Sequence, residues 1–259
     1  MGKTVTAGTK ASLHLAPRDL AREGLAALKA KANPKQAEGA QKYFKDQVQI
    51  MGLTSADVRL LAQTMFLKVK DAWTADQAVE LGNILLLNPF LEAKSLAILI
   101  LGRLVRTARP THFQKIRSWF ESDYLDNWAS TDVFCGEVLS PYLERFPEFK
   151  AKLKEWTKAR NMWVRRASAV ALVTPARRGK DLDLAYDIAV RLFNNPEDLM
   201  HKACGWLLRE AGKTDMPRLE KFLLAHGPKI PRTSLRYAIE RFEPKKRRSL
   251  LVATSARPR

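Results

Sequence analysis

Prolines stand at or near the start of one apolar-periodic segment after another, and this feature most constrains what the chain can fold into. Pro17, Pro34, Pro110 and Pro217 each sit in such a position. A proline is well accommodated in the first turn of a helix but breaks the interior. Val, Ile and Thr never alternate with polar residues over a strand length, and no Asn-Gly or Asp-Gly hairpin signal occurs. The sequence therefore predicts an all-α chain of many short helices.

The helical periodicity predicts about a dozen helices joined by short turns. Thr54 opens a capping-box-like start, and Asn88-Pro89 and Asn195-Pro196 each stop one helix and begin the next. We expect helices near 17–31, 35–48, 55–69, 74–87, 90–107, 111–121, 126–145, 149–159, 162–173, 181–194, 197–212, 216–226 and 231–242.

Such a train of helices fits an α-solenoid of degenerate, HEAT-like helix pairs with a concave basic groove. No strict sequence repeat is visible, so a compact helical bundle remains the structural alternative. We expect a disordered N-terminal tail over 1–15, a single domain over 16–243 and a basic C-terminal tail over 244–259.

The distribution of charge indicates a polyanionic partner. The net charge is +18, of which residues 150–259 contribute +15 and the first 149 residues only +3. This asymmetry predicts a nucleic-acid-binding protein, and duplex DNA is the expected partner. A membrane surface is the weaker alternative, because the excess is spread over many helices rather than held in one amphipathic helix.

Other classes of protein fit the composition poorly. No apolar run approaches the roughly 18 residues that span a bilayer. Cys135 and Cys204 look like buried apolar residues in a reducing compartment, and the four histidines lack metal-ligand spacing. We therefore expect a monomeric protein of the cytoplasm, nucleoid-associated if bacterial, that uses neither metal nor cofactor.

Three segments combine aromatic and charged residues at intervals close to one helical repeat. The first contains Trp128 and Asp132, which are four residues apart and share one helical face. The second contains Trp163, Arg165 and Arg166, and the third contains Trp206. Asp132 and Arg166 are 34 residues apart, and Arg166 and Trp206 are 40 apart, so equivalent helices of successive units would carry them along one wall.

Each of these residues also has an ordinary structural interpretation. A helical tryptophan is more often core than site, Asp132 is able to cap or pair with an arginine, and Arg166 is able to hold a helix end. Together, however, they predict a polar and aromatic cleft in the basic half of the chain.

The chemistry of such a cleft fits cleavage of an N-glycosidic bond. That reaction develops positive charge on the sugar, which a fixed carboxylate stabilises while it orients water. Tryptophan faces favour cations, and an arginine is able to hold the flanking phosphate. A cationic N-alkylated purine leaves readily, so a single carboxylate suffices.

At these residues the chain resembles the AlkD family of DNA alkylation repair proteins, which are DNA glycosylases of HEAT-like repeats. The resemblance runs from about Ala37 to about Arg241. It is strongest in the three segments, in residues 37–45 with 51–53, and in residues 205–210. It implies that Asp132 is catalytic, that Trp128, Trp206 and Arg166 complete the site, and that Tyr43 contacts DNA. It also implies excision of N3- and N7-alkylated purines, such as 7-methylguanine and 3-methyladenine, in a mode in which the aromatics cradle the deoxyribose and the lesion need not be flipped into a pocket.

One departure from the family pattern concerns the residues beside the motif tryptophan. Asn127 and Ala129 stand where the family has an aromatic and an acidic residue. Because the aspartate is retained, we expect the chemistry to survive, with a changed lesion range or affinity.

Two other functions fit the sequence. One is a non-catalytic binder of distorted or branched DNA, and the other is a helical scaffold for acidic proteins. For DNA contact we single out ten residues: Tyr43, Lys45, Trp163, Arg165, Arg177, Arg178, Lys180, Lys202, Arg209 and Lys213. The basic run 245–248 is interpreted as a solvated end with some attraction for DNA, with a phosphate contact or a localisation signal as alternatives.

Overall fold

The computed structural model describes residues 15–255, and within that range all regular secondary structure is helical. Its only β-type pairing in the described range is an isolated bridge between Gln49 and Phe90. The prediction of an all-α fold is confirmed. The α-helices are α1 (Pro17–Ala30), α2 (Pro34–Gln41), α3 (Ser55–Val69), α4 (Ala75–Leu85), α5 (Leu91–Leu104), α6 (His112–Glu121), α7 (Trp128–Phe134), α8 (Ser140–Arg145), α9 (Lys152–Trp156), α10 (Met162–Val170), α11 (Val173–Arg177), α12 (Leu182–Leu192), α13 (Asp198–Ala211), α14 (Met216–His226), α15 (Arg232–Ala238) and α16 (Pro244–Ala253).

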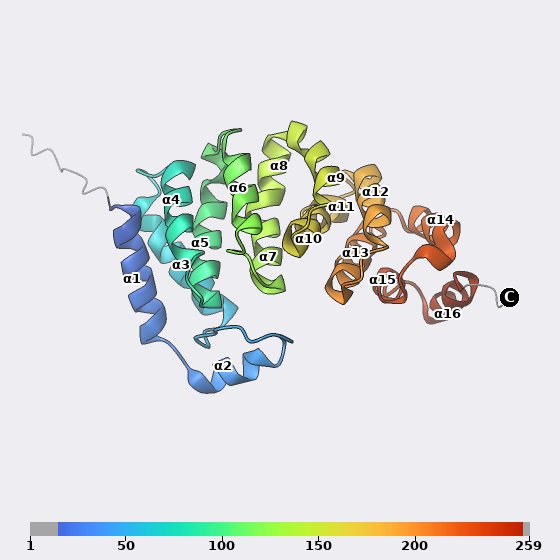
Figure 1. The fold of residues 1–259 in the computed structure, drawn as a ribbon, viewed down its shortest axis with the longest axis horizontal. Helices are drawn as coiled ribbons and strands as arrows, with labels where there is room; N and C mark the ends of the chain where they lie inside the picture. Colours follow the sequence, from blue (N-terminus) through green and yellow to red (C-terminus); the bar gives the residue numbers. More distant parts are fainter. Residues whose placement is uncertain (1–14, 256–259) are drawn as a thin grey trace, which may run out of the picture.

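The helices stack side by side along the long axis of the molecule, from α1 at one end to α16 at the other (Figure 1). One continuous row is formed by α5, α7, α10, α13 and α15, each of which packs against the next. The three segments with aromatic and charged residues fall on α7, α10 and α13. Their spacing of about one repeat in the sequence thus places them on consecutive helices of this row.

Helix α2 is shorter than the periodicity predicts, because it ends at Gln41 rather than near residue 48. The Gln41 side chain closes the following loop: its Nε2 donates to the Asp46 carbonyl at 2.9 Å, and its Oε1 accepts from the Val48 N–H at 3.1 Å. These bonds satisfy backbone groups that a longer helix would otherwise pair. The loop of residues 42–50 leaves the helical stack and reaches the cleft described below.

The predicted helix over 126–145 is one helical run in three parts, α7, a π-helical stretch (η2, Cys135–Leu139) and α8. The predicted helix over 162–173 ends at Val170, and it is followed by α11, which the periodicity did not predict.

At the C-terminus, the structure differs from the expected tail. Residues 244–253 form α16, which begins with Pro244 and buries Leu250, while residues 256–259 lie outside the described range. Of the N-terminal tail expected over 1–15, only Leu15 is described, and its carbonyl accepts a hydrogen bond from Trp73 Nε1 at 3.0 Å.

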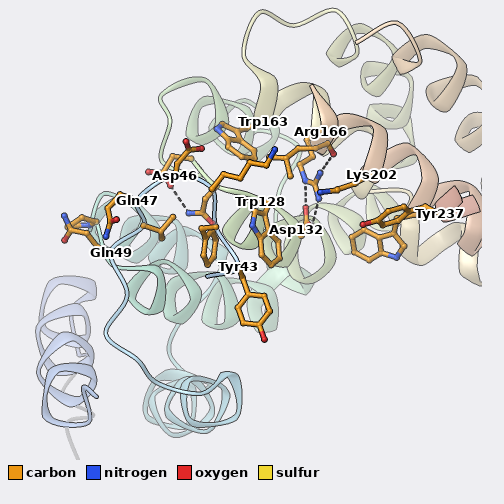
Figure 2. Close-up of a pocket in the computed structure, with 18 of the residues that line it drawn as sticks. Tyr43, Asp46, Gln47, Gln49, Trp128, Asp132, Trp163, Arg166, Lys202 and Tyr237 are labelled. Atoms are coloured by element: carbon orange, nitrogen blue, oxygen red, sulfur yellow. Dashed lines mark hydrogen bonds and ion pairs between the residues drawn. The ribbon is translucent and has the colours of Figure 1, made fainter. Parts of the chain in front are cut away.

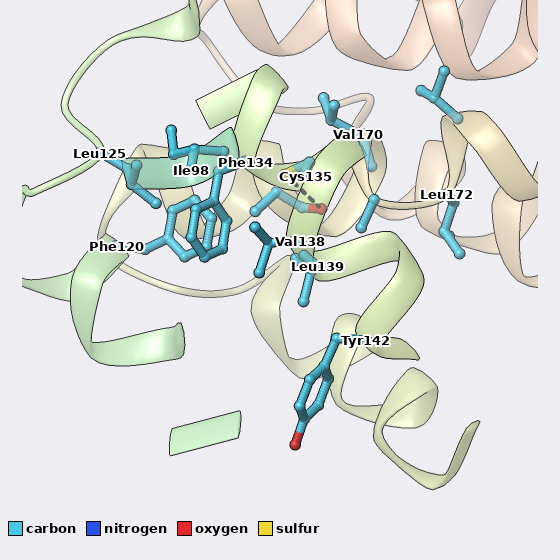
Figure 3. Packing of buried hydrophobic residues seen from close by; sticks show 14 of the residues in the cluster. Ile98, Phe120, Leu125, Phe134, Cys135, Val138, Leu139, Tyr142, Val170 and Leu172 are labelled. Atoms are coloured by element: carbon cyan, nitrogen blue, oxygen red, sulfur yellow. Dashed lines mark hydrogen bonds between the residues drawn. The ribbon is translucent and has the colours of Figure 1, made fainter. Parts of the chain in front are cut away.

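A hydrophobic core runs through the whole stack and contains both cysteines as free thiols. Around Cys135, Phe134 meets Phe120 edge to face, with 5.4 Å between the ring centroids (Figure 3). Burial raises the pKa of the Cys135 thiol well above its usual value and that of Cys204 to about 12. Both cysteines thus behave as the small apolar residues that the sequence suggests.

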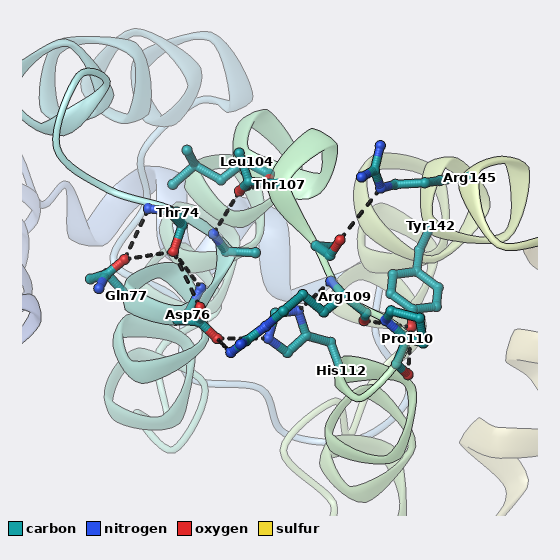
Figure 4. A network of polar contacts seen from close by, with 12 residues as sticks. Thr74, Asp76, Gln77, Leu104, Thr107, Arg109, Pro110, His112, Tyr142 and Arg145 are labelled. Atoms are coloured by element: carbon teal, nitrogen blue, oxygen red, sulfur yellow. Dashed lines mark hydrogen bonds and ion pairs between the residues drawn. The ribbon is translucent and has the colours of Figure 1, made fainter.

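A polar network joins α4 to the turn before α6 on another part of the stack (Figure 4). His112 Nδ1 accepts from the Arg109 N–H at 3.2 Å, and its Nε2 lies 2.9 Å from Asp76. The hydrogen bond from His112, reinforced by Arg109, lowers the pKa of Asp76. This histidine therefore ties two helices together.

The close approach of α13 and α15 depends on Gly205. A Cβ at this position would lie 2.5 Å from the Tyr237 Cβ and 2.6 Å from the Ser234 carbonyl oxygen. We expect Gly205→Ala to lower the free energy of unfolding by about 1–3 kcal/mol, because the helices must separate to admit the methyl group. Urea unfolding followed by tryptophan fluorescence measures this. In the matched variant Gly39→Ala on α2, no atom lies within 4 Å of the new Cβ; it should leave the stability unchanged or raise it slightly, and equal losses in both variants would contradict the packing argument.

Candidate active site

A cleft of about 580 Å³ lies where the loop after α2 meets the row of α7, α10, α13 and α15. Figure 2 shows Trp128, Asp132, Trp163, Arg166 and Lys202 converging on it from three successive helices. The loop supplies one wall, and Tyr237 of α15 lies at the opposite side. The four residues expected at the centre, Trp128, Asp132, Arg166 and Trp206, therefore line a single cleft.

Asp132 and Arg166 form a two-pronged ion pair in the cleft wall. Arg166 Nε donates to Asp132 Oδ1 and its Nη2 donates to Oδ2, both at 2.8 Å. The side chains are 14% and 5% exposed, respectively. Burial raises the pKa of the Asp132 carboxyl, and the hydrogen bonds and charge of Arg166 oppose that rise. The pair thus keeps one carboxylate fixed at the edge of the cleft.

This geometry gives Arg166 a different partner from the phosphate that the sequence suggested. Its Nη1 donates to the Leu199 carbonyl, so all three guanidinium nitrogens already have acceptors within the protein. Arg166 is therefore placed to orient Asp132.

The cleft holds half of the chain's six tryptophans. Trp73, Trp119 and Trp156 are buried in the core, in the manner usual for this residue, whereas Trp128, Trp163 and Trp206 are partly exposed and line the cleft. Phe44 from the loop stacks on Trp128, with 5.2 Å between the ring centroids and 23° between the planes.

Two asparagine N-caps fix where α7 and α10 begin, and they thereby place Trp128 and Trp163 in the first turns of these helices. Asn127 Oδ1 accepts from the Ser130 N–H at 2.9 Å, so Trp128 begins α7. Asn161 Oδ1 accepts from the Trp163 N–H at 2.8 Å at the start of α10. The residue that departs from the family pattern, Asn127, thus has a definite local task in this chain.

Only half of the ten residues expected to contact DNA line the cleft, namely Tyr43, Lys45, Trp163, Lys202 and Arg209. Tyr43 is 78% exposed at the start of the loop. Lys202 pairs with Asp198 at 2.9 Å, and this hydrogen bond raises the pKa of Lys202. The other five, Arg165, Arg177, Arg178, Lys180 and Lys213, lie outside the lining.

Arg165 is largely buried and is held by contacts within the protein. It is 14% exposed, pairs with Glu197, and donates to the carbonyls of Ala159 and Arg160 at 2.7 and 2.8 Å. These contacts tie the start of α10 to the preceding turn and to the start of α13.

Arg177 and Lys213 converge on the buried Glu210, each at 2.6 Å. Burial pushes the pKa of Glu210 up, but the hydrogen bonds and charges of Lys213 and Arg177 outweigh that effect and leave it lowered. Arg178 reaches Glu144 at 3.4 Å on the exposed surface.

Several residues that line the cleft were not predicted from the sequence as site residues, among them Phe44, Asp126 and Tyr237. Asp126 accepts a hydrogen bond at 2.8 Å from Lys94, whose side chain is buried. Phe44 belongs to a segment that carries the family resemblance, but it lies in a loop where helical periodicity gives no face. Tyr237 lies 31 residues beyond Trp206, on the next helix of the row. This spacing is close to those between the three predicted segments, and it is the signal in the sequence that could have identified Tyr237 as a cleft residue.

Within residues 15–255, no group of three or more His, Cys, Asp or Glu side chains could hold a metal ion. In the same range, no helix has both the length and the apolar character needed to cross a bilayer.

The fold and cleft together define a stacked-helix protein with an acid and three indoles in one open, partly cationic groove. The family model for DNA alkylation repair enzymes matches residues 25–242. The chain belongs to this family, as the resemblance implied, and its substrate is therefore DNA.

A solved structure agrees on the fold. It is described as a predicted DNA alkylation repair enzyme from Enterococcus faecalis, and it superposes with a TM-score of 0.72 at 16% identity, covering 82% of this chain and 97% of its own. No curated protein sequence matches the chain significantly.

Proposed function

We propose that the protein is a DNA glycosylase that hydrolyses the N-glycosidic bond of N3- and N7-alkylated purines in duplex DNA. The observation that carries the proposal is the placement of Asp132, which Arg166 holds at the cleft edge among Trp128, Trp163 and Trp206. Family membership supports alkylated DNA as the substrate.

In the proposed reaction, the bond between C1′ of the sugar and the purine nitrogen breaks, and its electron pair leaves with the base. A cationic alkylated purine departs as a neutral molecule, so no acid catalyst is required. The Asp132 carboxylate stabilises the positive charge on the sugar and orients the water whose oxygen bonds to C1′; the proton that this water loses passes to the solvent, and a C1′ hydroxyl remains. The indole side chains of Trp128 and Trp206 line the same cleft, and indole rings attract positive charge.

The test is release of 7-methylguanine and 3-methyladenine from methylated duplex DNA by the wild-type protein, measured by chromatography of the freed bases. We expect both bases to be released without added metal or cofactor. Binding of the duplex without release of either base would contradict the proposal and support a non-catalytic DNA-binding protein.

The raised pKa of Asp132 predicts an acid limb in the pH profile of base release. The reaction needs the ionised carboxylate, so the rate should fall as the pH drops through the pKa of Asp132. Arg166 holds that pKa down against burial. Arg166→Gln should therefore move the acid limb to higher pH, and Arg166→Lys, which keeps a positive charge, should move it less. Identical limbs in all three proteins would show that Arg166 does not act through Asp132.

A further inference from the structure

We infer that α15 and α16 form a second contact surface for the DNA backbone, beyond the cleft. This inference goes further than base excision and does not depend on it, since it concerns binding of undamaged duplex. The residues of α16 lie outside the segment that matches the family model, which ends at residue 242.

The first observation is that α16 is a fixed helix rather than a loose tail. Leu250 is 2% exposed, and the Arg232 guanidinium donates to the Leu251 carbonyl at 3.2 Å. Lys246 pairs with Glu220 of α14 at 2.5 Å. These contacts fix the helix axis, so the cations on its open side have defined positions.

The second observation is the charge of this end of the molecule. From Lys229 to Ser255 the chain has eight Lys or Arg and two Glu. Glu240 is already paired with Arg209. Six exposed cations of this range have no ion-pair partner among the described residues, namely Lys229, Arg232, Arg236, Arg241, Lys245 and Arg248. A cluster of one sign repels itself and attracts a polyanion.

The third observation is continuity with the cleft. Tyr237 of α15 lines the cleft, as does Arg209, whose partner Glu240 closely follows α15. Arg241 is the next residue, and α16 begins at Pro244. Figure 1 shows α15 and α16 at the end of the helical row opposite to α1 and α2. A duplex engaged at the cleft and directed toward this end would bring its phosphates, about one charge per 1.7 Å of axis, to these side chains.

The experiment compares the salt dependence of binding to an undamaged duplex, measured by fluorescence anisotropy, for two charge-matched double variants. Lys245→Ser/Arg248→Ser removes two cations from α16. Arg106→Ser/Lys158→Ser removes two exposed cations from η1 (Val105–Thr107) and from the turn after α9; neither residue lines the cleft or has an ion-pair partner among the described residues. All four side chains are exposed, and circular dichroism verifies that both proteins fold.

We expect the α16 variant to lower the slope of log affinity against log salt by about 0.9 for each phosphate that is no longer neutralised, hence about 1.8 in total, while the control keeps the wild-type slope. Equal slopes in the wild type and both variants, or equal reductions in both variants, would overturn the inference. Binding to vesicles of anionic lipid that falls in the α16 variant while duplex binding does not would also overturn it, in favour of a membrane surface.

Discussion

Replacing Asp132 with asparagine is expected to reduce base release from methylated duplex DNA by at least about 10²-fold while leaving duplex affinity unchanged. The amide keeps the shape of the side chain but removes the negative charge that the proposed mechanism places beside the sugar. Single-turnover release of 7-methylguanine measures the loss, and anisotropy with the same duplex measures affinity. Undiminished release by the variant would remove Asp132 from the mechanism.

Stability needs its own control, because the same substitution leaves the buried Arg166 guanidinium without a counter-charge. Breaking one partner of a buried pair costs about 3–5 kcal/mol, so thermal unfolding must show that the variant is folded at the assay temperature. The double variant Asp132→Asn/Arg166→Gln removes the unpaired charge and should be equally inactive. Asp46→Asn makes the same change at an exposed carboxylate of the same cleft and should retain release.

Replacing Glu92 with alanine is expected to lower the free energy of unfolding by about 3–5 kcal/mol. The buried Glu92 carboxylate, at the start of α5, accepts from the N–H groups of Met51, Gly52 and Leu53 at 2.9, 2.8 and 3.2 Å. Its loss leaves these donors without an acceptor, and each such donor costs about 1–3 kcal/mol. Urea unfolding followed by circular dichroism gives the value.

Substitutions at Glu92 can be graded by the number of acceptor oxygens that they keep. Glu92→Gln keeps one acceptor oxygen and should cost less than Glu92→Ala, whereas Glu80→Ala, at an exposed glutamate of α4, should change stability little. If Glu92→Ala and Glu80→Ala are equally stable, the three hydrogen bonds do not anchor the segment. Because residues 51–53 connect to the loop that carries Tyr43 and Phe44, the alanine variant should also weaken duplex binding.

Family membership and the helical class followed from local patterns. A 3.6-residue apolar period was sufficient for α3, α4, α12 and α14, whose observed bounds lie close to those predicted; Thr54 and Thr74 mark the starts of α3 and α4, and Pro217 marks that of α14. The apolar period did not predict the end of α2, where a side chain takes over hydrogen bonds from the backbone. The Gln41 side chain bonds backbone groups of the following loop, and the spacing of apolar residues does not indicate such bonds. The C-terminal segment was interpreted by its charge, and the burial of Leu250, which makes it a helix, depends on a distant surface.

For the cleft, too, some features could be predicted from the sequence and others depend on the tertiary structure. By itself the sequence determined that the segments with Trp128 and Asp132, with Arg166 and with Trp206 are each separated by about the length of one helical repeat. This spacing places them on equivalent helices of a stack. Only the tertiary structure decided the partners of each charge. Arg166 binds Asp132, Arg165 binds Glu197, and Arg177 binds Glu210. Burial and distance select among many possible ion pairs, and both quantities exist only once the helices have packed.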